Sequence, residues 1–92
     1  MNRCVLDCAR LATAEAYYAE LSRQLRLPAH FGGNLDALFD ALTRDVAGPV
    51  EIRVRNAART PPALRGELAR LVKTLGEAAR ERRDLSLVIE PN

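Results

Sequence analysis

The chain has 92 residues, of which 48% are hydrophobic, 28% charged and 4% aromatic, and its formal net charge is +2. This size and composition predict a single soluble domain over residues 1–92. No apolar run approaches the ~20 residues of a membrane span, and residues 1–8 lack the apolar stretch of a secretory signal, so we expect a cytoplasmic protein.

The first predicted element is a short strand over residues 4–7, which contains Cys4 and ends beside Cys8. No second cysteine pair or histidine stands at a zinc-like spacing from them. We therefore expect both cysteines to be small apolar core residues in a reducing compartment, and we expect no metal site.

A helical pattern follows, with Thr13 as a suitable N-cap residue. Its inward stripe comprises Leu21, Leu25 and either Tyr17 or Tyr18. Pro28 disfavours helical geometry at Leu27, so the helix should end there and lead into a turn over residues 29–33 that contains two glycines.

The second helical pattern runs from Asn34 to Val46 and predicts one continuous helix with Asn34 as its N-cap. One side carries Leu35, Leu38 and Leu42. The opposite side carries Asp36, Asp40 and Thr43, with Phe39 at its edge. Asp36 complements the helix dipole in the first turn, but Asp40 has no such structural explanation. The acidic face is either a plain solvated surface or a binding surface.

The rest of the chain predicts a strand from Val50 to Val54, a helix that begins at Pro61-Pro62, and a strand from Leu85 to Ile89. The inward residues of this last helix are Leu64, Leu68, Leu71, Val72 and Leu75, and Gly76 is expected to interrupt it. The crossovers are long enough to make neighbouring strands parallel. The predicted fold is therefore α/β, with a small three-stranded parallel β-sheet flanked by three to four α-helices.

The charged residues are distributed unevenly, since no Lys or Arg occurs from Leu27 to Thr43. The later segment instead carries Arg53, Arg55, Arg59, Arg65, Arg70 and Lys73, with Glu67 as its acidic residue. This segment is either a solvated helix face or, as an alternative function, a small nucleic-acid-binding module from Arg53 to Lys73. It lacks the aromatic residues on which bases stack.

The sequence contains no pattern typical of a catalytic site. His30 is the one histidine, and no Ser or Cys nucleophile is arranged near it. There is also no Gly-rich phosphate loop and no HExxH motif. We therefore expect neither an enzyme nor a bound cofactor.

The run from Phe31 to Thr43, with Leu27-Pro28 before it and Pro49 and a strand after it, resembles the barstar-like ribonuclease inhibitors. The shared pattern is aromatic-Gly-x-Asn-Leu-Asp-Ala-Leu-aromatic-Asp, and the order of elements extends the resemblance over nearly the whole chain. The resemblance implies a small intracellular inhibitor, monomeric when free, of the immunity or antitoxin type. It would block the active site of a secreted ribonuclease with its second helix and the preceding loop.

The resemblance also implies which residues bind the partner: His30, Phe31, Gly32, Asn34, Asp36, Phe39, Asp40, Thr43, Arg44 and Glu77. Asp40 matches the central carboxylate of the family, Asp36 its acidic partner, and Glu77 an outlying acidic contact. Arg44 departs from the pattern, because it replaces a small residue at the end of the helix. It could repel a basic cleft or pair with an acidic group of another partner.

The net charge of +2 is a second departure, since the best-known family member is clearly acidic. Long-range steering toward a basic ribonuclease should be correspondingly weaker. A family member with a partner other than a nuclease is a further alternative to the ribonuclease inhibitor.

Overall fold

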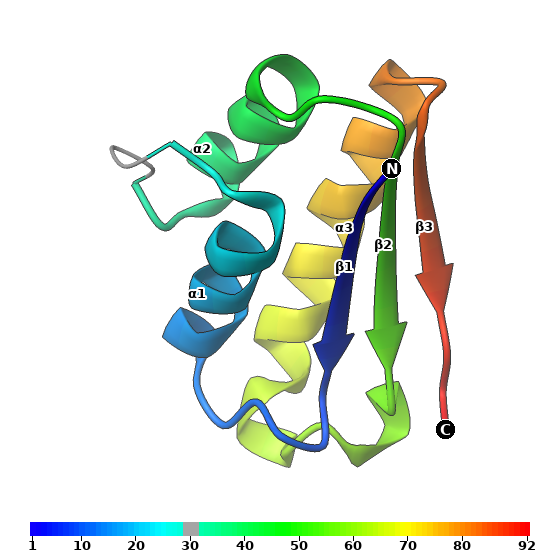
Figure 1. Cartoon of the computed structure of the whole chain (residues 1–92). Helices are drawn as coiled ribbons and strands as arrows, with labels where there is room; N and C mark the ends of the chain where they lie inside the picture. Colours follow the sequence, from blue (N-terminus) through cyan, green and yellow to red (C-terminus); the bar gives the residue numbers. More distant parts are fainter. Residues whose placement is uncertain (29–31) are drawn as a thin grey trace.

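The computed structural model describes residues 1–28 and 32–92. Its elements, in chain order, are β1 (Asn2–Asp7), α1 (Ala14–Leu25), α2 (Leu35–Asp40), the π-helix η1 (Ala41–Asp45), β2 (Val50–Arg55), the 3₁₀-helices η2 (Ala57–Arg59) and η3 (Pro62–Leu64), α3 (Arg65–Glu81) and β3 (Leu85–Ile89) (Figure 1). None of the helices in the described ranges has the length and apolar character needed to cross a membrane.

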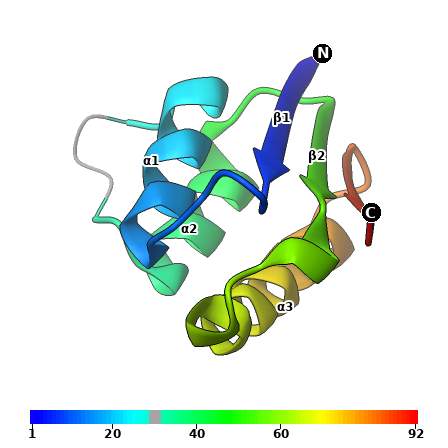
Figure 2. The same ribbon diagram turned by 90° about the horizontal axis from the view of Figure 1, so that it is seen from below.

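The three strands form one parallel sheet in the order β1-β2-β3, which confirms the predicted α/β fold. Cys4 of β1 lies beside Ile52 of β2, which in turn lies beside Leu87 of β3. Both crossovers place their helices on the same face of the sheet, as the view along the strands shows (Figure 2). Such a one-sided arrangement follows when successive parallel strands are joined by crossovers of the same hand.

The core lies between this sheet face and the helices. Its largest fully buried side chains include Leu6, Tyr17, Leu21, Leu38, Leu42, Ile52, Leu71 and Leu75. Tyr17, rather than Tyr18, is therefore the inward aromatic residue of α1. Cys4 and Cys8 are free thiols, 0% and 1% exposed, which confirms their prediction as core residues.

Charged side chains, rather than a second layer of helices, line the other face of the sheet. Glu51 forms ion pairs with Arg3 at 3.0 Å and with Arg53 at 2.9 Å. Glu90 pairs with Arg53 at 3.1 Å and with Arg55 at 3.0 Å. Parallel sheets are usually covered on both faces. Here the five charged residues form a continuous ladder across the uncovered one.

The start of α1 agrees with the prediction, whereas its last helical residue is Leu25 and not Leu27. The Thr13 hydroxyl accepts a hydrogen bond from the Ala16 amide at 3.2 Å, which caps the first turn. Arg26 adopts the left-handed conformation at φ 54°, which ends the helix two residues before Pro28.

Two predictions about the later helices require correction. Gly76 does not interrupt α3, which continues unbroken to Glu81 because its buried stripe packs on the sheet. The segment after Asn34 is not one continuous α-helix: it is α-helical from Leu35 to Asp40 and then widens into η1. The Val46 amide accordingly donates to the carbonyl five residues earlier.

The change of helix type coincides with Thr43. Its hydroxyl donates to the Phe39 carbonyl at 2.8 Å and lies 3.3 Å from the Asp40 carbonyl. A Thr side chain that bonds the carbonyl four residues earlier competes with the regular backbone ladder and bends helices. Hydrophobic spacing alone does not report such competition, which is why the sequence predicted a regular helix.

Candidate partner-binding site

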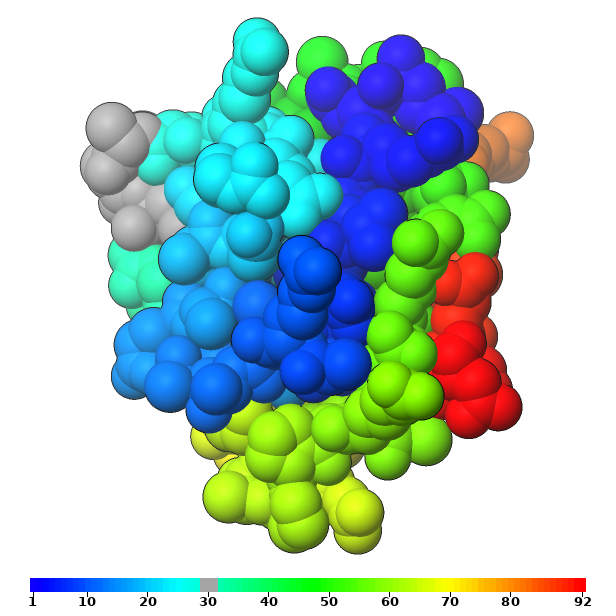
Figure 3. Space-filling view, turned by 60° about the horizontal axis from the view of Figure 1, so that its bottom comes forward, coloured from blue at the N-terminus to red at the C-terminus, as the bar shows by residue number. Residues whose placement is uncertain are grey.

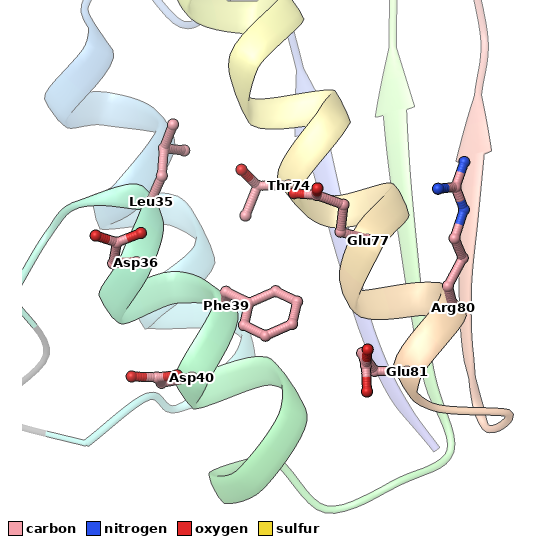
Figure 4. A pocket seen from close by; sticks show the side chains of 8 residues that line it. All are labelled: Leu35, Asp36, Phe39, Asp40, Thr74, Glu77, Arg80 and Glu81. Atoms are coloured by element: carbon pink, nitrogen blue, oxygen red, sulfur yellow. The ribbon is translucent and has the colours of Figure 1, made fainter.

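A cleft of about 620 Å³ lies between α2 and α3. Figure 4 shows its lining, which comprises Leu35, Asp36, Phe39 and Asp40 from α2, and Thr74, Glu77, Arg80 and Glu81 from α3. The cleft therefore joins two segments about 40 residues apart in the chain, and four of the sequence-predicted site residues line it.

The α2 side of the cleft begins at a capped helix end. The side-chain oxygen of Asn34 accepts a hydrogen bond from the Ala37 amide at 2.8 Å, so Asn34 acts as the predicted N-cap. Asp36 and Asp40 are both exposed and stand one turn apart on the same side of α2 (Figure 4). Neither carboxylate forms an ion pair with any residue that the structure describes. Both remain available to a partner.

Phe39 lies deeper than the sequence suggested. It projects from α2 toward α3 (Figure 4), is half-buried, and packs against the hydrophobic core. The prediction placed it at the edge of the outward face. In the structure the ring instead separates the acidic residues of α2 from those of α3. It gives the cleft an apolar centre.

Glu77 and Glu81 provide the acidic groups on the α3 side. Both are exposed, and within the described part of the chain neither has an ion-pair partner. Sequence reasoning missed Glu81, although its spacing of four residues from Glu77 places the two on one helix face. Arg80 also contributes to the lining, but its side chain extends from α3 on the side away from α2 (Figure 4).

The cleft is strongly acidic in spite of the positive charge of the whole chain. Four carboxylates and one guanidinium line it, a formal sum of −3. The four carboxylates repel one another, so the cleft favours a cationic partner. Carboxylates that leave water on binding need donors opposite them, and Arg side chains supply these in bidentate geometry.

In residues 1–28 and 32–92, no three His, Cys, Asp or Glu side chains cluster in a way that could hold a metal ion.

Three further predicted residues, Gly32, Thr43 and Arg44, lie outside the cleft lining. The Thr43 hydroxyl is used in backbone hydrogen bonds, and Arg44 is exposed in η1. Gly32 is exposed before α2. His30 and Phe31 lie outside the described residues.

The basic segment predicted as an alternative interface is divided between two sides of the molecule. Arg53 and Arg55 belong to the ion-pair ladder on the uncovered sheet face. Arg70 lies on α3, which packs on the opposite face, and pairs there with Glu67. Backbone-tracking nucleic-acid sites need their cations along one groove. These arginines do not form one.

The comparisons with known proteins agree with this architecture. The family described as Barstar (barnase inhibitor) matches residues 1–90. A protein of Bacillus subtilis (strain 168), named "Putative ribonuclease inhibitor YrdF", is 28% identical over 91 residues, which cover 98% of this chain and 100% of that protein. The family match extends over both halves of the acidic cleft as well as all three strands. The chain therefore belongs to the Barstar family.

Proposed function

We propose that the protein is an intracellular inhibitor that blocks the active site of a secreted ribonuclease with the acidic cleft between α2 and α3. The observation that carries this proposal is the set of four carboxylates that have no ion-pair partner among the described residues and that two different helices present around Phe39. Membership in a family described as barnase inhibitors supports it.

The chemistry of the partner follows from its substrate. A ribonuclease must hold the phosphates of RNA, so its active site presents cationic groups. A rigid carboxylate surface can occupy the same positions and pair with the same groups. Phe39 adds apolar area at the centre, where interfaces exclude water.

The size of the molecule is sufficient for such a complex. Its accessible surface is 5589 Å². A standard protein interface takes about 800 Å² from each partner, or about one-seventh of that surface. The cleft and its rims can supply this area without rearrangement of the sheet.

Inhibition and capture assays test the proposal. Asp40→Lys and the double variant with Ala at Asp36 and Asp40 serve as baits beside the wild type in pull-downs from the native cell. The captured basic ribonuclease is then assayed for inhibition. Glu15→Gln is the matched control, because Glu15 is an exposed carboxylate on α1, away from the cleft.

We expect the wild type and Glu15→Gln to capture and inhibit the ribonuclease equally. Asp40→Lys should abolish inhibition, and the double variant should weaken it at least about ten-fold, because it loses charge-assisted hydrogen bonds. Retention of a ribonuclease complex by Asp40→Lys would show that the cleft is not the binding site. Capture of the same proteins by all baits would reject it as well.

A further inference from the structure

Arg82 links the α3 side of the acidic cleft to the side formed by α2 and η1, although it does not line the cleft itself. It immediately follows α3, and its side chain is only 14% exposed. Its Nη1 donates to two carbonyl oxygens near the end of η1, that of Leu42 at 2.8 Å and that of Val46 at 2.7 Å. Its Nε and Nη2 both donate to the Asp84 carboxylate at 2.9 Å.

This arrangement satisfies groups that a helix end leaves without partners. The last carbonyls of a helix have no intrahelical donor, and a positive charge beside them is favourable. The Asp84 carboxylate fixes the guanidinium plane, so that the remaining nitrogen is directed at η1. Arg82 therefore caps a helix that belongs to the other side of the cleft.

Side-chain contacts also hold the segment that connects η1 to β2. A Cβ atom built on Gly48 would overlap the Asp84 carboxylate and the Arg82 guanidinium, so this pair packs directly on the backbone there. On the β1 side, the Asn2 side chain donates to the Ala47 carbonyl. The backbone amide of Asn2 donates to the Pro49 carbonyl at 2.8 Å. The whole segment between η1 and β2 is bound from two directions.

The acidic helix needs such support because it is short. α2 and η1 together span residues 35–45, and an isolated helix of this length is marginal in water. Leu38 and Leu42 anchor one side in the core, and Asn34 caps the first turn. The far end depends on Arg82.

We propose that Arg82 is a positioning residue of the acidic cleft. By capping η1 from the end of α3, it holds Asp36 and Asp40 in a fixed relation to Glu77 and Glu81. Its effect on inhibition rests on the function proposed above. Its effect on the order of α2 and η1 does not, so the two can be tested separately.

The first test uses the free protein and compares Arg82→Gln with Arg83→Gln. Arg83 is the adjacent, exposed arginine, which has no hydrogen bond or ion pair with any described residue, so both variants lose the same charge. In Arg82→Gln we expect amide hydrogen exchange over residues 38–46 to accelerate about ten-fold or more, with β2 unchanged. Arg83→Gln should exchange like the wild type. Equal exchange in both variants would overturn the proposal.

The second test measures inhibition of the captured ribonuclease in a double-mutant cycle. Asp40→Asn is introduced into the wild type, Arg82→Gln and Arg83→Gln, all at temperatures where circular dichroism shows them folded. If Arg82 positions Asp40, the fold-loss from Asp40→Asn should shrink in the Arg82→Gln background and stay unchanged in the other. Additive effects in both backgrounds would reject positioning and leave only a general contribution to stability.

A further pair of variants covers the case in which Arg82→Gln fails to fold. Gly48→Ala should displace the Arg82–Asp84 pair and reproduce the faster exchange of residues 38–46, and Arg82→Lys should give an intermediate rate. Wild-type exchange in Gly48→Ala would contradict the proposal. A wild-type protein that inhibits no ribonuclease would refute the proposed function, while the exchange results would still decide whether Arg82 orders the helix.

Discussion

Gln24 replaces a missing neighbouring strand at the edge of the sheet, and its removal should destabilise the protein measurably. β1 is an edge strand, and α1 packs along it (Figure 3). The Gln24 side-chain oxygen accepts a hydrogen bond from the Val5 amide at 2.8 Å, and its nitrogen donates to the Val5 carbonyl at 2.9 Å. One amide side chain thus satisfies both outward backbone groups of this residue.

The expected magnitude follows from these two hydrogen bonds. Each contributes about 1 kcal/mol net, so Gln24→Ala should lower the free energy of unfolding by about 2 kcal/mol. For a domain of this size that corresponds to a decrease in Tm of about 8–16 °C. The variant also leaves the middle of an edge strand unpaired, which favours association between copies.

Urea denaturation followed by circular dichroism measures the loss of stability, and light scattering measures association. Arg23→Ala is the control on the same helix, because Arg23 forms an exposed ion pair with Glu20 that is worth under about 1 kcal/mol. A Gln24→Ala stability within about 0.5 kcal/mol of the wild type would refute the role of Gln24 as a strand substitute.

Three further predictions concern the core, the thiols and the dependence of stability on acidic pH. Ile52 is 0% exposed at the centre of the sheet, so Ile52→Ala should cost about 2–5 kcal/mol in urea unfolding, and a loss under about 1 kcal/mol would contradict the assigned core. Burial raises the pKa of the Cys4 thiol to about 12 and also raises the pKa of the Cys8 thiol. Iodoacetamide should therefore label neither cysteine in the native protein near pH 8, and both in denaturant. Rapid labelling of the native protein would contradict this burial. The hydrogen bonds from Arg82 lower the pKa of Asp84, so their stabilisation is present above the ordinary carboxyl pKa of about 4 and is lost as the pH falls through the lower folded value. Asp84→Asn should therefore lose less stability than the wild type between about pH 5 and about pH 2, and parallel losses would disprove the linkage.

Much of the fold is predictable because its determinants are local. The alternation from Val50 to Val54 reports a strand with one buried face, and the observed strand extends it by one residue. Thr13 and Asn34 cap helices because their side chains reach amides three residues later. These interactions depend on spacing within a few residues, which a sequence displays directly.

The features that the sequence did not predict depend on contacts between distant residues. Arg82 meets the Leu42 carbonyl 40 positions away, and nothing in the local pattern marks that arginine apart from Arg83 beside it. The same holds for the cleft, since the position of Glu81 opposite Asp40 follows from the packing of α3 against α2. Resemblance to a family identified Asp36, Asp40 and Glu77, whereas tertiary packing brings the two helices together and adds Glu81.

The net charge of +2 and a proposed acidic binding surface are compatible because opposite charges lie on different faces. The ladder on the uncovered sheet face holds Arg3, Arg53 and Arg55 against two glutamates, whereas the cleft carries a formal −3. The molecule measures 32 × 24 × 19 Å, and exposed charges are screened beyond about 8 Å at physiological ionic strength. A cation docked in the cleft is therefore influenced mainly by its carboxylates and only weakly by the arginines of the far face. In the proposed complex, the positive total reduces steering at long range, while short-range pairing depends mainly on the carboxylates of the cleft.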